Sequence, residues 1–250
     1  MDKIIDIHSH VLYGVDDGSR TLKESLEIID YLKSVGIYDI VLTSHYIKDT
    51  KYESDVKTRT EILEKLKSKL NDKDVKLYLG NEVYLCDELV ELYKNKKITT
   101  LNNSKYMLVE LPLVNYFSNF QNVLCEINEL GLIPVMAHPE RYRFIQKNKK
   151  RINEILDYGC LLQCNIDSLT GKYGRDAKRV MKWLLKNDLV TFVATDTHRV
   201  GDKVKLEKAY KKLKKLVGEE RYEELTYSNP KRILNSKNIK NKYFEKENNW

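Results

Sequence analysis

Short apolar runs alternate with stretches of helical periodicity along most of the chain. The runs are apolar at successive positions rather than at every second one, which is typical of parallel strands buried on both faces. We therefore predict strands over seven stretches: residues 3–10, 39–45, 75–82, 106–111, 132–138, 160–166 and 190–198.

Helices are predicted between these strands. The first begins at a capping box, Thr21 to Glu24, and ends at Gly36. About seven βα units result, and their repetition favours a closed or nearly closed α/β barrel over separate layers. Apolar residues at helical spacing mark the buried faces: Leu22, Leu26, Ile29 and Leu32; Ile62, Leu66 and Leu70; Phe120, Val123, Leu124 and Ile127; Ile152, Ile155 and Leu156; Val180, Met181 and Leu184.

A single domain is expected, because no Pro-, Gly- or Ser-rich linker interrupts the series. We predict a barrel domain over residues 1–236 and a polar, frayed tail over residues 237–250. After Gly201 the chain becomes helical and charged. In that part a stripe for packing on the barrel is formed by Leu206, Ala209, Leu213 and Leu216.

Composition places the chain among soluble globular proteins, since 42% of its residues are hydrophobic and 32% are charged. The net charge of +7 has two interpretations. It can be an ordinary lysine-rich surface, or it can attract an acidic partner such as a phosphoprotein or the anionic inner leaflet of the membrane. The chain lacks the stripe of arginine and aromatic residues that would indicate nucleic-acid binding.

The sequence indicates a cytoplasmic protein. A charged residue within the first three positions argues against a signal peptide, and no apolar stretch approaches the roughly 18 residues that span a bilayer. The four cysteines lack the spacing of a zinc site, which suggests buried thiols in a reducing compartment.

All five histidines fall at the carboxyl ends of predicted strands: His8, His10, His45, His138 and His198. A lone histidine is more often structural than a ligand. However, the carboxyl ends of parallel strands form the face where barrel enzymes carry their chemistry. His8 and His10 are two residues apart on a strand and therefore face the same side. Together, the five predict a metal site.

Carboxylates join the histidines at the same ends. Glu82 and Glu110 end strands, Asp196 precedes His198 by two residues, and Asp17 lies in the loop after the first strand, with Asp16 as the alternative. These donors are too many for one ion. Imidazole and carboxylate together suit two or three divalent cations such as Mn²⁺, Fe²⁺ or Zn²⁺.

Six motifs carry a family resemblance: DIHSHVLYGVDDGSRT, TSHY, GNEVY, VELP, AHPERY and TDTH, in this order between positions 6 and 198. They resemble the polymerase-and-histidinol-phosphatase (PHP) superfamily, and more narrowly its bacterial protein tyrosine phosphatases of capsular and exopolysaccharide loci. The resemblance implies a distorted (β/α)₇ barrel of the PHP fold and a trinuclear metal cluster, most commonly of manganese. The ligands it implies are His8, His10, Asp17, His45, Glu82, Glu110, His138, Asp196 and His198.

The resemblance also implies a substrate and a phosphate-binding residue. The substrate would be the phosphotyrosine tail of a bacterial tyrosine autokinase, met in the cytoplasm or peripherally at the membrane. Arg141 of the HPERY motif matches the phosphate-binding arginine of the family. Relatives often place a second arginine, before proline, a few residues beyond the D-x-H element, and here Arg199 or Lys203 is the candidate for that role.

The expected reaction is attack on phosphorus by a metal-activated hydroxide. The phenolate leaving group has a conjugate-acid pKa of about 10, so a metal or an acid near Asp196 or His198 suffices to assist it. Thiol chemistry is excluded, since the arginine that a thiol phosphatase needs six residues after its cysteine is absent after Cys86, Cys125, Cys160 and Cys164.

Two other functions remain open from the sequence. The first is a histidinol-phosphatase-like phosphomonoesterase with the same barrel and metals, acting on a small alkyl phosphate. The second is a non-catalytic module that only binds a phosphotyrosine tail. Phosphate release in the presence of Mn²⁺, from phosphotyrosine peptide and from histidinol phosphate, distinguishes the three.

Overall fold

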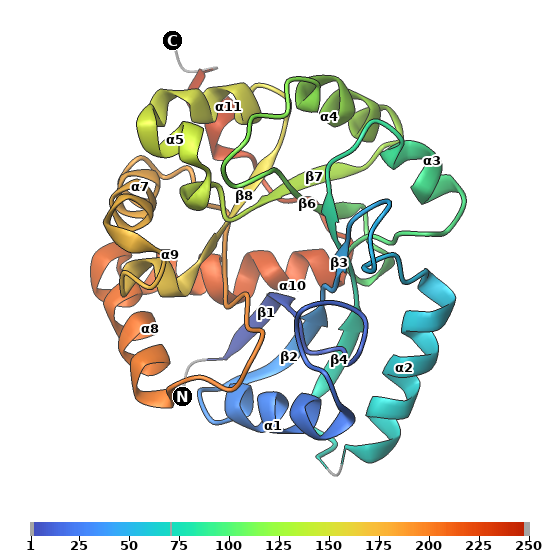
Figure 1. Ribbon diagram of the computed structural model, residues 1–250. Helices are drawn as coiled ribbons and strands as arrows, with labels where there is room; N and C mark the ends of the chain where they lie inside the picture. Colours follow the sequence, from blue (N-terminus) through green and yellow to red (C-terminus); the bar gives the residue numbers. More distant parts are fainter. Residues whose placement is uncertain (1–2, 71, 248–250) are drawn as a thin grey trace.

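The computed structural model describes residues 3–70 and 72–247 (Figure 1). Each predicted strand stretch contains at least one strand, and the strands pair in parallel. The strands are β1 (Ile4–Ser9), β2 (Ile37–Leu42), β3 (His45–Tyr46), β4 (Lys76–Leu79), β5 (Glu82–Tyr84), β6 (Tyr106–Glu110), β7 (Ile133–Ala137), β8 (Leu161–Asn165) and β9 (Phe192–Ala194).

The strands form two sheets, with the orders β1-β2-β4 and β3-β5-β6-β7-β8-β9. The stretches predicted as single strands over 39–45 and 75–82 are each divided, and they pass from the first sheet to the second. Gly80 lies at the second break, where an added Cβ would be 3.0–3.1 Å from Val41, Leu101 and Thr43. Neighbouring side chains therefore pack closely against the backbone at this break.

The two sheets also meet at the other edge. The amide of His10 donates to the carbonyl of Thr197 at 2.9 Å, and Ser9 and Thr197 form an isolated parallel bridge. The ladders are not one continuous sheet, which is why the barrel is distorted. The α/β class and the distorted barrel predicted from the sequence are confirmed.

Helices surround the strands (Figure 1). The first half of the predicted capping box forms at the first of them, since Thr21 accepts from the amide of Glu24 at 3.2 Å. The Glu24 carboxylate accepts from the amide of Arg20, the residue before the N-cap, at 2.8 Å. The α-helices are α1 (Leu22–Lys33), α2 (Val56–Lys69), α3 (Leu89–Lys94), α4 (Phe120–Glu129), α5 (Arg143–Lys147), α6 (Asn153–Leu156), α7 (Gly174–Lys186), α8 (Lys203–Val217), α9 (Glu219–Glu223), α10 (Asn229–Leu234) and α11 (Lys242–Glu247).

Short helical turns connect several elements. Four are 3₁₀ turns: η1 (Leu101–Asn103), η2 (Pro139–Arg141), η3 (Lys149–Ile152) and η4 (Ile166–Leu169). A π turn, η5 (Glu224–Ser228), joins α9 to α10. The turns η2 and η4 follow β7 and β8 directly, so they lie at the carboxyl ends of the strands.

An apolar cluster lies inside the barrel, between the strands and α10. Ile5, Val41, Leu108 and Phe192 belong to it, and Ile233 of α10 packs against them. We call these residues the base cluster. In Figure 1, α10 crosses behind the strands. The carboxyl ends are thus left as the open end of the barrel, which we call the mouth.

The C-terminal part of the chain packs on the base of the barrel. The Tyr106 hydroxyl donates to the carbonyl of Lys237 at 2.7 Å, and Ile239 contacts the base cluster. Leu216, predicted to pack with Leu206, Ala209 and Leu213, is 49% exposed, because α8 turns this position to solvent near its end. Residues 248–250 of the predicted tail lie outside the described residues, and the domain limits 1–236 and 237–250 stay a prediction.

Within the described ranges 3–70 and 72–247, every helix is too short or too polar to cross a membrane.

Candidate metal centre

Nine side chains from the strand ends and the segments that follow them converge at the mouth. His8 and His10 come from the end of β1, His45 and Glu82 from the starts of β3 and β5, and Glu110 from the end of β6. The other four lie in connecting segments after strands. We call the full set the histidine–carboxylate cluster: His8, His10, Asp17, His45, Glu82, Glu110, His138, Asp196 and His198.

Glu82 lies at the centre of this cluster. Its Oε2 atom is 3.1 Å from His8 Nε2, 3.2 Å from His10 Nε2 and 3.1 Å from His45 Nδ1. Its Oε1 atom is 2.8 Å from His138 Nε2. One buried carboxylate thus faces four imidazoles, and the prediction that His8 and His10 face the same side holds, with 3.2 Å between their Nε2 atoms.

Asp196 lies against the same two imidazoles. Its Oδ1 atom is 3.5 Å from His8 Nε2 and 3.4 Å from His10 Nε2. Its Oδ2 atom accepts from Arg141 at 2.9 Å and from the Asn165 amide at 2.6 Å. One oxygen of Asp196 therefore faces the cluster, and the other is held from outside.

His138 and Asp196 have left-handed backbone conformations, with φ values of 34° and 53°. Left-handed φ is uncommon for residues other than glycine and costs free energy, so such residues persist where the surrounding structure requires them. Both residues follow a strand and turn their side chains into the cluster. The alternation of a regular strand, on which the sequence prediction relied, does not apply to these two.

Asp17 and Asp16 have different surroundings. Asp17 Oδ1 is 3.6 Å from His45 Nε2 and 3.3 Å from His198 Nε2, and the Asp17 side chain is half exposed. The Asp16 carboxylate accepts from His10 Nδ1 at 2.7 Å and from the amide of His45 at 3.0 Å, so it holds the imidazole of His10 from behind. Asp17 is the one of the two whose oxygen faces the cluster.

A chain of hydrogen bonds fixes which nitrogen of His8 faces the cluster. The Asp196 carboxylate can only accept, so Asn165 presents its amide nitrogen to it and accepts through Oδ1 from Gln163 Nε2 at 3.0 Å. Gln163 Oε1, 2.8 Å from His8 Nδ1, must then accept. In its neutral form, which is the form that binds a metal, His8 therefore carries its proton on Nδ1, and the lone pair of Nε2 points into the cluster.

Several atoms of the cluster are buried without any hydrogen-bond partner. Glu82 Oε2, Glu110 Oε2 and the Nδ1 atoms of His45 and His138 are in this position. Buried polar atoms are nearly always satisfied, so a concentration of orphaned acceptors at one place needs a reason. Divalent cations supply one. The cluster contains four overlapping groups of three or four residues, and within each group the ligand atoms lie within 4.8 Å of one another.

Several ionisable groups of the cluster have pKa values that differ from their ordinary values. Burial opposes ionisation of Glu82, but the imidazoles of His8 and His45 outweigh it and hold the pKa of Glu82 well below its usual value. Burial and the charge of Glu82 raise the pKa of Glu110 well above its usual value. Burial lowers the pKa of His45. Packing two carboxylates together thus favours the protonated form of Glu110, unless a cation compensates.

The pKa values of His10 and Asp17 are shifted by their hydrogen-bond partners. Burial disfavours the charged form of His10, but the Asp16 carboxylate raises the pKa of His10 well above its usual value. The hydrogen bond from His198 lowers the pKa of Asp17 to about 2. Metal binding would therefore displace protons from His10 and Glu110, which makes it dependent on pH.

Arg141 lies at the edge of the cluster, where η2 places it. Its guanidinium binds Asp196, and its carbon atom is 4.4 Å from the ring centre of Tyr173. Arg199 donates to the carbonyls of Gly18 and His198 and lines the same 850 Å³ hollow as Arg141. Lys203 faces Glu207 at 3.8 Å and does not line that hollow.

Three of the four cysteines are unsuited to nucleophilic chemistry. Cys160 and Cys164 are fully buried on β8 or next to it, and burial raises the pKa of both thiols. Burial also raises the pKa of Cys86. A reactive cysteine needs the opposite shift, since the thiolate is the nucleophile.

Sequence reasoning missed the residues that hold the cluster from behind. Gln163 and Asn165 are polar, two residues apart, in the apolar run CLLQCNI, and that signal could have pointed to them. Glu140 is fully buried and accepts from the amide of Asn165 at 2.9 Å and from the hydroxyl of Ser168 at 2.7 Å, which ties η2 to η4. Nothing in the sequence marked Tyr173 as the partner of Arg141.

Comparison with known proteins agrees with this arrangement. Residues 4–235 match the family model described as capsular polysaccharide synthesis, CpsB/CapC. The tyrosine-protein phosphatase CpsB of Streptococcus agalactiae is 34% identical over 239 residues, which cover 92% of this chain and 98% of that protein. The tyrosine-protein phosphatase YwqE of Bacillus subtilis is 30% identical over 199 residues, covering 79% and 78%.

A solved structure is similar over nearly the whole chain. It belongs to the crystal structures of YwqE from Bacillus subtilis and CpsB from Streptococcus pneumoniae, described as unique metal-dependent tyrosine phosphatases. Its TM-score is 0.88 at 28% identity, and the match covers 95% of this chain and 96% of the other. The resemblance inferred from the sequence motifs is confirmed: this chain belongs to the CpsB/CapC family of capsular polysaccharide synthesis.

Proposed function

We propose that this chain is a metal-dependent protein tyrosine phosphatase. Its substrate is a phosphotyrosine tail of a bacterial tyrosine kinase that regulates capsular or exopolysaccharide synthesis, met in the cytoplasm. The convergence of unpartnered imidazole and carboxylate atoms beside Arg141 carries the proposal. The names of its relatives, which are tyrosine-protein phosphatases, support it.

The histidine–carboxylate cluster would hold two or three divalent ions. Its mixture of nitrogen and oxygen donors suits Mn²⁺ foremost, with Fe²⁺ or Zn²⁺ as alternatives. All nine members are assigned as ligands, with Asp17 rather than Asp16 because only Asp17 has an oxygen that faces the cluster. When bound, such ions supply a water that ionises near neutral pH and positive charge for the phosphoryl oxygens.

Arg141 orients the phosphoryl group. Its planar guanidinium can donate two parallel hydrogen bonds to phosphate oxygens, which a lysine cannot do. The ion pair with Asp196 and the contact with the Tyr173 ring hold it at the edge of the cluster. Arg199 lines the same hollow and is the second candidate for this role, ahead of Lys203, which does not line it.

Of Asp196 and His198, His198 is the better candidate to protonate the leaving phenolate, a role that it can fill only while its imidazole is not bound to a metal. Burial favours a neutral Asp196, but the positive imidazoles of His8 and others overcome this and keep the pKa of Asp196 far below its usual value, so it stays a carboxylate. His198 is partly exposed, and its Nδ1 atom lies 3.0 Å from the carbonyl of Asp196. It can exchange protons with solvent after each turnover.

The decisive experiment measures phosphate release by protein that has been stripped with a chelator and then reloaded. We expect release from a phosphotyrosine peptide only after Mn²⁺ is added, and no effect of alkylating the thiols. Faster turnover of histidinol phosphate than of the peptide would indicate the small-molecule phosphomonoesterase instead. Tight peptide binding without phosphate release, in metal-loaded protein, would indicate a binding module.

A further inference from the structure

Two hollows meet at Arg141 and Tyr173, which line both. The first, of 850 Å³, extends past Asp196 and His198 toward the start of α8. The second, of 720 Å³, lies between the segment after β6, α5 and the start of α7. A polypeptide whose phosphotyrosine reaches the histidine–carboxylate cluster would pass along one or both of them.

The first hollow is nearly neutral. Its four arginines and lysines are accompanied by three carboxylates. Lys172 lies 2.9 Å from Asp167, and Lys205 lies 3.7 Å from Asp202. Arg199 donates to two backbone carbonyls, which hold its guanidinium in place. With four cations against three carboxylates, the hollow has little net positive charge to attract an acidic chain.

The second hollow carries three more cations than carboxylates. Arg179 is paired with Asp176 at 2.9 Å, and Arg141 is paired with Asp196. Arg143 and Lys147 are exposed, and within residues 3–70 and 72–247 their side chains form no hydrogen bond or ion pair. We call this second hollow the Arg143–Lys147 groove.

The Arg143–Lys147 groove also has an apolar wall. Leu113 and Val114 line it, and Val114 is 67% exposed. The amide of Arg143 donates to the carbonyl of Leu113 at 2.9 Å, so the wall and the cations are fixed relative to each other. Unneutralised cations beside an apolar wall suit a peptide that has both acidic and apolar side chains.

We propose that the Arg143–Lys147 groove binds acidic residues of the substrate chain, located within a few residues of the phosphotyrosine. This rests on the proposed phosphatase function and adds the chemistry by which a substrate is chosen. The cations act at the surface, so their effect is moderate and sensitive to salt. Their role is to select and orient the chain, while the histidine–carboxylate cluster acts on the phosphoryl group.

The test uses three phosphotyrosine peptides of equal length. One is neutral, one has four glutamates before the phosphotyrosine, and one has four after it. The measured quantity is the ratio of kcat/KM for an acidic peptide to that for the neutral peptide, taken within one metal-loaded enzyme. We expect a ratio of about three to ten for at least one acidic peptide at low salt, falling toward one as salt is raised.

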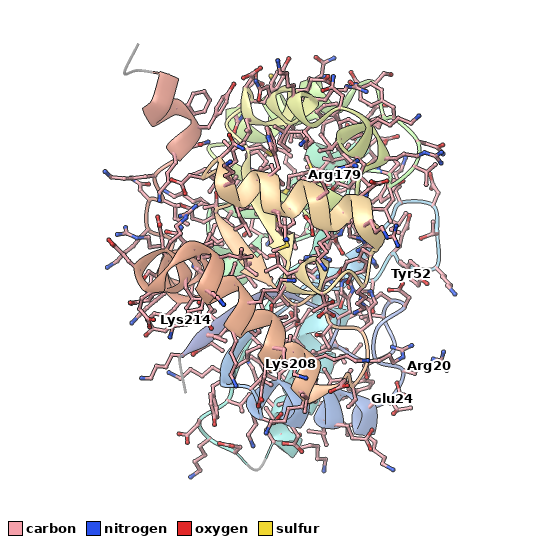
Figure 2. All side chains as sticks on the ribbon, turned by 90° about the vertical axis from the view of Figure 1, so that its left-hand side faces the viewer. Arg20, Glu24, Tyr52, Arg179, Lys208 and Lys214 are labelled. Carbon is pink, nitrogen blue, oxygen red and sulfur yellow. The ribbon has the colours of Figure 1, made fainter. Side chains whose placement is uncertain are left out.

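Two double variants with the same change of charge are compared, and a third changes the charge by half as much. Arg143→Glu with Lys147→Glu should reduce the ratio to one or below, and Arg143→Gln with Lys147→Gln should reduce it partly. Lys208→Glu with Lys215→Glu, on α8, should keep the wild-type ratio. Figure 2 shows Lys208 on α8, a helix separate from the α7 that bears Arg179.

Three outcomes would overturn the proposal: a wild-type ratio near one for both acidic peptides, an unchanged ratio in the groove variants, or an equal loss in the α8 variant. Failure of the proposed function would look different, since no peptide would then release phosphate. In that case the affinities of the acidic and neutral peptides, measured by fluorescence anisotropy, still decide whether the groove binds acidic residues.

Discussion

The base and the mouth of the barrel share strands but differ in the chemistry of their buried side chains. At the base, Ile5, Val41, Leu108 and Phe192 pack against one another and against Ile233 of α10. At the mouth, a few residues further along β1 and β6, the buried side chains are His8 and Glu110. Several polar atoms there have no hydrogen-bond partner.

The difference separates stability from function along each strand. Apolar packing at the base contributes free energy of folding without any ligand. Buried charges and orphaned acceptors at the mouth cost free energy and are expected to be compensated only by a bound cation. Removal of metal should therefore damage the mouth and leave the base folded, which the following predictions test.

The largest effect is expected from Glu82→Gln. The amide removes the charge that faces four imidazoles, and it places N–H donors against lone pairs that would bind metal. We expect a loss of at least about 10³-fold in kcat/KM, since metal ligation fails. Inductively coupled plasma analysis of purified protein should show less bound metal. Full metal content with full activity would contradict the assignment of Glu82 as a ligand.

Phe192→Ala tests the opposite end. Phe192 is fully buried in the base cluster, so its removal leaves a cavity and should lower the free energy of unfolding by about 3–5 kcal/mol. Urea denaturation measures this, and kcat/KM per folded molecule should stay unchanged. A large change in metal affinity would show that the base and the mouth are not separate.

Asp6 lies between the two ends, on β1. Burial raises its pKa to about 6, although Thr195 donates to it through both its amide and its hydroxyl. The folded state thus keeps a proton that the unfolded state loses near pH 4. The contribution of Asp6 to the free energy of unfolding of metal-free protein should fall between about pH 4 and pH 6, by about 3 kcal/mol at most.

Asp6→Asn should remove the part of the fall that comes from Asp6, because the amide does not ionise, whereas the raised pKa of Glu110 contributes a fall to both proteins. The raised pKa of His10 contributes stability that is constant below about pH 6.5 and is lost above it, so it does not affect this window. Asp17, with its pKa of about 2, changes the free energy of unfolding only below about pH 4. Denaturant titrations at several pH values measure the difference between the two proteins. Parallel curves would mean that Asp6 is already ionised when buried.

The sequence predicted which side chains converge at the mouth better than it predicted the residues that surround them. Strand ends are recognisable from apolar runs, and parallel strands bring their carboxyl ends together, so the sequence was enough to place His45 and Glu82 near each other. The breaks after β2 and β4 could not be predicted, because they depend on how closely strands from distant parts of the chain approach Gly80.

The choice between Asp16 and Asp17 likewise needed three dimensions. Both residues lie in the same loop, and only the fold shows that Asp16 accepts a hydrogen bond from His10 Nδ1. The role of Gly18 was equally unpredictable: an added Cβ would lie 2.1 Å from the carbonyl of His10, so the loop closes only with glycine there. Such contacts depend on backbone geometry that residue types alone do not specify.

Gln163→Met is expected to have the smallest effect at the mouth. Methionine keeps the volume of the side chain but cannot accept from His8 Nδ1, so the imidazole loses the bond that fixes its tautomer. We expect metal affinity, measured by competition with a chelator, to fall by about 10- to 100-fold. Nitrogen-15 spectra of the metal-free protein should show His8 shifting away from the form protonated at Nδ1.

Two further variants separate positioning from simple loss of packing. Gln163→Glu still accepts from His8, so the tautomer should be retained. Thr226→Val removes a buried hydrogen bond outside the mouth, from Thr226 to the carbonyl of Tyr222 at 2.8 Å. It should lower stability without changing the spectrum of His8 or the metal affinity. If Gln163→Met and Thr226→Val act alike, then Gln163 contributes only to the fold, and the tautomer of His8 is set by the cations themselves.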